Sequence, residues 1–418
     1  MTRTVYTSLF LIFLFLASCG IEQQPEKEQK SLFIILDGIS ADVLEMVDTP
    51  HFDDIIENGS YTRAYIGGTK DGYSESPTVS AVGYNHLLTG VWSNKHNVYD
   101  NNIENPNYNY WNIFRLFKHN YPEKDVAVYS SWLDNRTKLI GEGLPEAGEI
   151  TIDIVYDGFE EDTLAFPHLE DGSHVQDIDE HVSELASKSI REEAPTLSWV
   201  YLWYPDTAGH IYGDGDIYYE SLKVADRQIG RIWEAIQYRE ENYNEDWQFM
   251  ITTDHGRRLP DGRHHGEHTT RERTIWIVSN QLDKNSYFTE SKPAVVDMYP
   301  TVSRHLDLDI PVSLNRELDG VPLIGDVSIS HPAAELSADQ TEISVGWQAW
   351  QEAGDVQIFV TPTNEFQVGN EDEYQLVKEV SIQAEEAVVD VSDFSSDFYK
   401  VVIEGADNTL NRWVLGNE

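Results

Sequence analysis

Short apolar runs alternate with amphipathic segments over the first three quarters of the chain. Five runs have the length and the continuous apolar character of strands that are buried on both faces. They cover residues 31–36, 126–129, 197–203, 247–252 and 274–278. Residues 218–242 carry apolar side chains at three- and four-residue spacing, as a helix with one buried face does. A further helix is expected from Pro50 to Gly59. This alternation predicts an α/β fold in which helices flank a central, mostly parallel sheet.

The pattern changes after about Gly325. From there, alternating apolar and polar residues form short runs separated by turn residues, which is typical of a small all-β sandwich. The runs cover residues 341–350, 354–363, 373–382, 387–393 and 398–405. The segment resembles a fibronectin type III-like module, with Trp347 as the expected core tryptophan. It shows no catalytic constellation, so we expect residues 326–418 to serve as a spacer or docking module.

The N-terminal residues have the pattern of an export signal. Arg3 precedes an apolar run from Leu9 to Leu16 that is too short for an ordinary membrane span. The run ends in "LASC", which resembles the lipobox of bacterial lipoproteins, where cleavage precedes an acylated cysteine. That residue, Cys19, is the only cysteine of the chain, so no intrachain disulfide can form. The alternative is an incidental cysteine after an ordinary signal.

These features predict a protein that is exported and anchored by a lipid on Cys19 to a bacterial cell-envelope membrane, either periplasmic or at the cell surface. The expected organisation has four parts. A signal peptide covers residues 1–18, a polar tether 19–30, a catalytic α/β domain 31–325 and the β-sandwich 326–418.

The chain is strongly acidic, with 73 Asp and Glu residues against 29 Lys and Arg and a formal net charge of −44. Bulk electrostatics therefore oppose binding to duplex nucleic acid or to an anionic bilayer surface. An anionic substrate needs a local positive feature, and bound divalent ions supply one. Most of the carboxylates are expected to serve solubility alone.

Aspartate and histidine residues gather at the ends of the predicted strands and in the loops that follow them. They are Asp37, Asp206, His210, Asp254, His255, His264, His265 and His268. Taken singly, each has a simpler interpretation, because an Asp after a strand usually caps a helix and a His is usually a satisfied polar group. Together they offer oxygen and nitrogen ligands that suit Zn²⁺ or a similar divalent ion, enough for two sites.

The order of these motifs resembles the alkaline phosphatase superfamily. Asp-Gly at 37–38 is followed by Thr-Gly at 89–90, Asp-x-x-x-His at 206–210, Asp-His-Gly at 254–256 and a late histidine. The similarity is greatest to the type I phosphodiesterase/nucleotide pyrophosphatase branch. The segments that carry it are "TPHFDDIIENG", "LLTGVWSNKHNVYDNN", "YPDTAGHIYG" and "VVDMYPTVSRHLDLDIPVSLNRELDGVPL". The resemblance covers about residues 31–325 and implies the α/β fold of that superfamily.

The resemblance implies two divalent metal ions, for which zinc is the expected identity. One ion is held by Asp206, His210 and a late histidine, and the other by Asp37, Asp254, His255 and Ser80. His265 is the expected late ligand, because the family's last ligand is usually followed by glycine. His268 is the second choice and His264 the third. The two unused histidines either support the site or are plain loop residues.

The expected nucleophile follows from spacing within the resemblance. In this superfamily it lies nine positions before the Thr of Thr-Gly, and counting back from Thr89 reaches Ser80. Thr78 is the alternative. Ser80 is expected to begin a helix whose N-terminal amides favour an ionised oxygen and an incoming phosphate. His86, in the same segment, is then a helix residue without a catalytic part.

One position departs from the family pattern. Relatives usually have Asn three residues after the nucleophile, in contact with the phosphoryl oxygen, and this chain has Gly83 there. Asn85 or the amide of Ala81 is a candidate to take over this contact. Arg136 and Lys138 are further candidates to bind substrate phosphate. A solvated loop is the simpler interpretation for these last two.

The resemblance implies a two-metal hydrolase of phosphodiester or pyrophosphate bonds in a small phosphate ester or nucleotide, working through a phospho-serine intermediate. A phosphomonoesterase is an alternative, because the same metal cluster serves both reactions. A non-catalytic surface binding protein that retains the fold is another. A sulfatase is disfavoured because residues 80–84 lack the Pro and Arg of the C/S-x-P-x-R motif. A phosphoethanolamine-type transferase is disfavoured because no apolar span follows the signal.

Overall fold

The structure is a computed structural model that describes residues 26–416. The expected signal peptide, Cys19 and most of the expected tether lie outside these residues. Strand β1 begins at Glu28, so residues 28–30 of the expected tether belong to the sheet. Within residues 26–416, no helix combines the length and the apolar character needed to cross a membrane.

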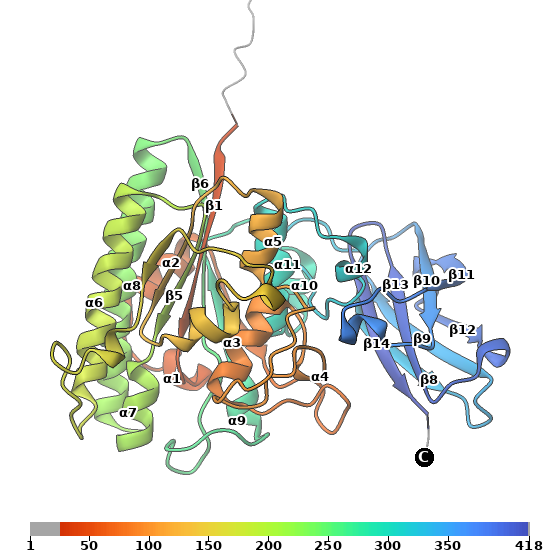
Figure 1. Cartoon of the computed structure of the whole chain (residues 1–418), viewed down its shortest axis with the longest axis horizontal. Helices are drawn as coiled ribbons and strands as arrows, with labels where there is room; N and C mark the ends of the chain where they lie inside the picture. The colour runs from red at the N-terminus through yellow and green to blue at the C-terminus, as the bar shows by residue number, and fades with distance from the viewer. Residues whose placement is uncertain (1–25, 417–418) are drawn as a thin grey trace, which may run out of the picture.

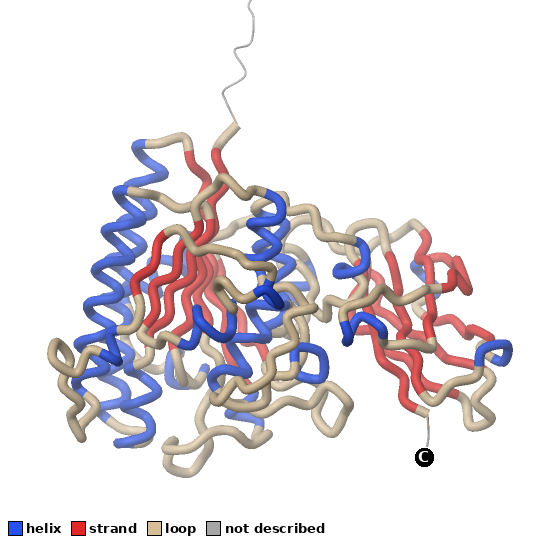
Figure 2. The backbone as a smooth tube through the Cα atoms, viewed as in Figure 1, coloured by secondary structure: helices blue, strands red, loops and turns tan. Residues whose placement is uncertain are grey.

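Seven strands form the central sheet in the order β2-β7-β6-β1-β5-β3-β4. Figures 1 and 2 show this sheet between layers of helices. The strands are β1 Glu28–Leu36, β2 Ser60–Tyr65, β3 Val126–Ser130, β4 Ile154–Tyr156, β5 Leu197–Leu202, β6 Glu245–Thr252 and β7 Thr274–Ser279. The strands from β6 to β4 are parallel to one another, and β7 and β2 extend the β6 edge in antiparallel fashion. The predicted mostly parallel sheet and its five apolar strands are confirmed, whereas β2 and β4 were not predicted.

Helices cover both faces of this sheet (Figure 1). They are α1 Ala41–Leu44, α2 Pro50–Asn58, α3 Ser80–Thr89, α4 Ser93–His96, α5 Ile113–Asn120, α6 Ser173–Glu192, α7 Tyr204–Tyr212, α8 Asp216–Asn242, α9 Thr270–Arg273, α10 Ser286–Glu290, α11 Met298–His305 and α12 Val312–Asn315. On β1, Leu32, Ile34 and Leu36 pack with α2, α6 and α8, whereas Phe33 and Ile35 pack with α3, α5 and α11. Two buried faces explain why this strand is apolar at consecutive positions.

Strands β8 to β14 form the C-terminal sandwich. They are β8 Ile329–Leu336, β9 Glu342–Ala349, β10 Asp355–Thr361, β11 Gln375–Ser381, β12 Glu386–Asp390, β13 Phe398–Glu404 and β14 Thr409–Leu415. The sheet β11-β10-β13-β14 packs on the sheet β12-β9-β8, and all pairings are antiparallel. Trp347 of β9 is buried, so its predicted core position is confirmed. The predicted small all-β sandwich is therefore present.

The carboxyl ends of β1, β5, β3 and β6 meet at one edge of the central sheet, the lower edge in Figure 1. Helices α3, α7 and α9 surround this edge. Ligands collect at such an edge in open α/β sheets, because the loops leave the strands there.

Candidate active site

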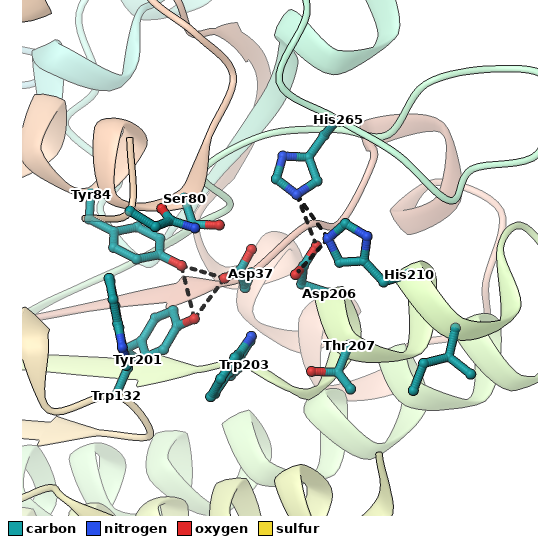
Figure 3. Close-up of a pocket in the computed structure, with 12 residues that line it drawn as sticks. Asp37, Ser80, Tyr84, Trp132, Tyr201, Trp203, Asp206, Thr207, His210 and His265 are labelled. Atoms are coloured by element: carbon teal, nitrogen blue, oxygen red, sulfur yellow. Dashed lines mark hydrogen bonds and ion pairs between the residues drawn. The ribbon is translucent and has the colours of Figure 1, made fainter. Parts of the chain in front are cut away.

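A pocket of about 360 Å³ opens at this edge of the sheet (Figure 3). Its lining combines strand ends, the beginnings of α3 and α7, and the loop before α9. The lining residues are Asp37, Ser80, Tyr84, Asn101, Trp132, Tyr201, Trp203, Asp206, Thr207, His210, Ile211 and His265. The pocket therefore gathers residues from segments far apart in the chain, including the expected nucleophile and four of the expected metal ligands.

Asp37, Asp254 and His255 form the first group of candidate metal ligands. Asp37 directly follows β1, and the other two follow the neighbouring strand β6, so strand pairing brings them together. His255 Nε2 lies 3.4 Å from Asp37 Oδ1 and 3.2 Å from Asp254 Oδ2. Ser80 Oγ lies 3.4 Å from the same nitrogen. One ligand atom from each of the three residues lies within 4.8 Å of the other two, so a single ion could bind all three.

The unpaired atoms of this first group are those that a cation would bind. Asp37 Oδ1 and Asp254 Oδ2 are buried and have no hydrogen-bond partner among residues 26–416. Leaving a buried carboxylate oxygen unpaired is costly. His255 Nδ1 lies 3.0 Å from the carbonyl oxygen of Gly256, so an N–H there donates to it and leaves the Nε2 lone pair facing the carboxylates. The group therefore fits a divalent metal ion.

Asp206, His210 and His265 form the second group. Asp206 and His210 lie four residues apart on one face of α7. His210 Nε2 lies 3.3 Å from Asp206 Oδ2 and 3.0 Å from His265 Nε2. His265 Nδ1 lies 2.8 Å from the carbonyl oxygen of Thr78, which leaves its Nε2 for an ion. The two groups adjoin, because the rings of His255 and His265 stack with centroids 3.6 Å apart.

Burial sets the charge state of the first group. Burial, with a smaller contribution from the charge of Asp206, raises the pKa of Asp37 to about 7. Burial and the charge of Asp37 raise the pKa of Asp254 well above its usual value. Burial lowers the pKa of His255 well below its usual range, so its imidazole is neutral at pH 7. A neutral imidazole beside carboxylates that disfavour one another's ionisation is an arrangement that a bound cation stabilises.

Of the two candidate nucleophiles, Ser80 is the one that faces the pocket. It is the first residue of α3 and belongs to the pocket lining, to which Thr78 does not belong. The Thr78 hydroxyl is engaged elsewhere, because it donates to the carbonyl of Glu267 at 2.6 Å and accepts the N–H of Gly266 at 3.1 Å. The geometry therefore favours Ser80 over Thr78 as the nucleophile.

The structure does not bring the three expected substrate-binding residues to the pocket. Asn85 is buried in α3 and lies outside the lining. Arg136 is ion-paired with Asp157, and Lys138 Nζ lies 2.8 Å from Asp134 Oδ2. Neither side chain belongs to the pocket lining, although Lys138 Nζ also lies 3.5 Å from the carbonyl oxygen of Asn102.

Gly83 does not belong to the pocket lining. A Cβ at this position would lie 2.8 Å from the carbonyl oxygen of Asp254 and 2.9 Å from its Cβ, so the glycine allows α3 to pack on the end of β6. The amide in the pocket belongs instead to Asn101, whose Oδ1 accepts the N–H of Ala81 at 2.9 Å. Sequence reasoning missed Asn101, although it stands near the end of the matched segment "LLTGVWSNKHNVYDNN".

Two tyrosines that the sequence did not single out bind the other oxygen of Asp37. The hydroxyls of Tyr84 and Tyr201 both donate to Asp37 Oδ2, the second at 2.6 Å, and lie 2.9 Å apart (Figure 3). Asp37 Oδ2 is therefore saturated by hydrogen bonds, while Oδ1 stays unpaired. This fixes which oxygen of Asp37 faces the ligand group.

Trp132 and Trp203 form an apolar wall of the pocket (Figure 3). Asp179 of α6 holds the two turns that carry them. Its carboxylate accepts the Ser131 hydroxyl at 2.6 Å and the N–H groups of Trp203 and Tyr204 at 2.9 and 2.7 Å. Burial raises the pKa of Asp179 to about 7. The buried Asp179 side chain thus holds in place the backbone of both turns that carry the tryptophans.

The remaining candidate histidines lie outside both ligand groups. His264 is exposed, and His268 Nδ1 lies 3.1 Å from Glu75 Oε1. The His86 ring packs against that of Trp92 inside the helical layer, away from the pocket lining. Of the three late histidines, the structure brings His265 to the other candidate ligands.

The model of the family "Type I phosphodiesterase / nucleotide pyrophosphatase" matches residues 31–375. The chain belongs to this family. The match includes both ligand groups and Ser80, and it continues into the C-terminal sandwich. The resemblance inferred from the sequence motifs is therefore confirmed.

Relatives of this phosphodiesterase-family chain are distant. It is 24% identical over 262 residues to ectonucleotide pyrophosphatase/phosphodiesterase family member 7 of Rattus norvegicus, covering 60% of this chain and 55% of the relative. It is 26% identical over 265 residues to venom phosphodiesterase 2 of Crotalus adamanteus, covering 57% of this chain and 28% of the relative. The chain thus spans about half, or less, of the length of these relatives.

Two solved structures share the fold. A putative sulfatase from Bacteroides thetaiotaomicron superposes with a TM-score of 0.52 at 11% identity, covering 88% of this chain and 86% of that one. The phosphonate monoester hydrolase of Agrobacterium radiobacter gives a TM-score of 0.50 at 14% identity, covering 92% and 88%. At such low identity these similarities establish the fold alone.

Proposed function

We propose that the protein is a metal-dependent hydrolase of phosphate esters that acts on phosphodiester or pyrophosphate bonds of a small molecule or nucleotide. The observation that carries the proposal is the position of Ser80 Oγ, 3.4 Å from His255 Nε2, beside two buried carboxylate oxygens without partners. Membership of the type I phosphodiesterase family supports the same class of reaction. The relatives named above are themselves phosphodiesterases or nucleotide pyrophosphatases by name.

The proposal includes two divalent ions, and the nitrogen and oxygen ligands favour zinc. The first group of ligands, with Ser80, would hold one ion, and the second group would hold the other. When bound, two such ions would supply Lewis acidity to the attacking and leaving oxygens of an in-line displacement. Their charge would also offset the net charge of −44 where an anionic substrate binds.

The protein's own groups would act in a fixed order. Ser80 Oγ attacks phosphorus, and the bond from phosphorus to the leaving ester oxygen breaks on the opposite side. The positive end of the α3 helix dipole would favour the incoming negative charge, while the N–H of Ala81 at this end is already donated to Asn101 Oδ1. Asn101 accepts the N–H of Ala81 at Oδ1, and its amide nitrogen, which has no hydrogen-bond partner among residues 26–416, would donate to a phosphoryl oxygen. Water then cleaves the phospho-serine and restores the Ser80 hydroxyl.

The variant Ser80→Ala tests this function. Hydrolysis of bis(p-nitrophenyl) phosphate should fall by about 10³-fold or more, because the attacking atom is lost. The zinc content, measured by plasma mass spectrometry, should stay close to that of the wild type, since six other ligands remain. Acid quenching of the wild type during turnover should yield a phosphate adduct on Ser80.

Thr78→Val is the matched control, because it removes the neighbouring hydroxyl that points away from the pocket. It should retain far more activity than Ser80→Ala. Full activity in Ser80→Ala, or an adduct on Thr78, would contradict the assignment of the nucleophile. Zinc binding without hydrolysis of any phosphate ester would instead favour a binding protein that retains the fold. Parallel rates on p-nitrophenyl phosphate separate diesterase from monoesterase activity.

A further inference from the structure

Arg257 places a buried cation among the segments that carry the candidate metal ligands. It follows Asp254-His255-Gly256 directly, and its side chain has an exposed fraction of 0%. Burying a guanidinium without partners is very unfavourable, so its contacts indicate what it stabilises. The mechanism proposed above does not use this residue.

The guanidinium of Arg257 is engaged in three directions. Nη1 donates to Asp206 Oδ1, Nε donates to the carbonyl of Gly262, and Nη2 donates to the carbonyl of Arg263 at 3.0 Å. One side chain therefore joins the end of β6, the first turn of α7 and the loop that leads to His265. These are the three segments that supply Asp254 and His255, Asp206 and His210, and His265.

Helix α7, which carries Asp206, leaves room for the Arg257 side chain at a glycine. Gly209 lies inside α7, where glycine lowers helix stability. A Cβ at this position would run into Nε and Cζ of Arg257. The ring of Tyr218 lies on another side, with its centroid 5.8 Å from Arg257 Cζ. The guanidinium thus occupies a space that the surrounding fold leaves open for it.

The contact with Asp206 has a direct consequence for ion binding. Arg257 donates to Oδ1 of Asp206, which also lies 3.7 Å from His265 Nε2, while Oδ2 lies 3.3 Å from His210 Nε2. Asp37 and Asp254 lie close by, so the carboxylates repel one another before any ion arrives. A fixed cation at one of the three offsets part of this repulsion and sets the direction of Asp206.

We propose that Arg257 is a positioning residue that assembles the second ligand group before the ion binds. It holds Asp206 in one orientation and holds the loop of residues 258–265 so that His265 is already in place. The proposal rests on the metal binding that belongs to the proposed function. It concerns geometry as well as charge, because a lysine cannot donate to three acceptors in the planar arrangement of a guanidinium.

The test compares Arg257→Lys and Arg257→Met with Arg258→Met. Arg258 is the matched control, because its side chain is one-third exposed and pairs with Glu267 of the same loop. Hydrogen exchange of the metal-free proteins reports the order of residues 258–268. Zinc titration against a competing chelator reports the affinity of each ion. Both measurements are independent of catalytic activity.

We expect both Arg257 variants to exchange about 10-fold or more faster in this loop when metal-free. One of two zinc ions should bind about 10- to 100-fold more weakly, as for other residues that orient metal ligands. The other ion should be unaffected, and Arg258→Met should behave as the wild type. Unchanged exchange of the β1 and β5 peptides shows that the variants are folded.

Wild-type loop protection and wild-type zinc affinity in Arg257→Met would overturn the proposal. Full recovery of both in Arg257→Lys would overturn it too, because charge alone would then suffice. If the wild-type protein binds no zinc, the proposed function itself is contradicted. If the wild type binds two ions and the variants show unchanged zinc affinity and hydrogen exchange, only the inference about Arg257 is contradicted.

Discussion

At the scale of single residues, three histidines lie within five positions of one loop and differ in their partners. The His265 Nδ1 atom lies 2.8 Å from the carbonyl oxygen of Thr78, and its Nε2 faces the other ligands. His268 faces Glu75 instead, and His264 is exposed. We therefore expect His265→Ala to bind about one zinc ion per chain in place of about two, with hydrolysis lowered by about 10²-fold or more.

The variants His264→Ala and His268→Ala are the controls for this prediction. Both should keep two ions and most of the activity, because neither ring belongs to a ligand group. Zinc is counted by plasma mass spectrometry after gel filtration in chelator-free buffer. Two ions in His265→Ala and one ion in His268→Ala would transfer the ligand role to His268.

The candidate metal ligands could be predicted from the sequence more readily than the other residues that line the pocket. Asp37 and Asp254 stand out because each follows an apolar strand, and neighbouring parallel strands bring such residues together. Tyr201 and Trp203 could not be singled out, since an aromatic residue at a strand end is usually part of the core. Arg257 was missed because an arginine after a glycine is typical of a solvated loop, and only the fold shows its burial.

At the scale of elements, α3 packs on the end of β6 through Gly83. A Cβ there would lie 2.8 Å from the backbone oxygen of Asp254. Backbone cannot yield as a flexible side chain can, so we expect Gly83→Ala to lower the free energy of unfolding by about 1–3 kcal/mol. It should also weaken zinc binding by the first ligand group, because Asp254 is displaced. Urea unfolding and zinc titration measure the two effects.

Gly215→Ala is the matched control for this variant. Gly215, which precedes α8, has an extended backbone with a φ of 168°, and nothing lies within 4 Å of a Cβ placed there. Its free energy of unfolding should change by no more than about 0.5 kcal/mol. Equal stability and equal zinc affinity in Gly83→Ala and the wild type would show that α3 does not need this close approach.

Whether a strand could be predicted from the sequence depended on its position in the sheet. The five predicted strands lie between the two edge strands, and each is marked in the sequence by a continuous apolar run. Strand β2 lies at one edge and mixes buried with exposed positions, so its sequence "SYTRAY" has no such run. Strand β4, at the other edge, has three residues. Edge strands need less apolar surface, which removes the signal.

At the scale of the whole molecule, the sandwich and the α/β part share one hydrophobic core. Buried residues of both parts, such as Val302 of α11 and Val401 of β13, belong to a single contiguous cluster. Lys95 of α4 is buried and donates to Asp319 and to Asn411 of β14, each at 2.7 Å. The pattern changes after Gly325 and β8 begins at Ile329, but composition could not show that the sandwich is packed against the α/β part.

A buried charge cluster at this junction allows the coupling to be measured. Lys400 of β13 is 1% exposed in its side chain, and its Nζ lies 2.5 Å from both Glu317 Oε1 and Asp372 Oδ2. Glu317 precedes the sandwich, whereas Asp372 belongs to it. Removing the cation leaves two buried carboxylates without compensation, so we expect Lys400→Met to lower the free energy of unfolding by about 3–5 kcal/mol.

The way in which Lys400→Met unfolds distinguishes a shared core from a loosely attached module. If the core is shared, heating or urea should unfold wild type and variant in a single transition, because neither part can lose its packing alone. Lys378→Met, which removes an exposed cation of β11, should change the free energy of unfolding by no more than about 0.5 kcal/mol. The contrary result would be two transitions in calorimetry, with the midpoint of the α/β transition unchanged in Lys400→Met. The sandwich would then unfold independently, and the stability of the α/β part would not depend on it.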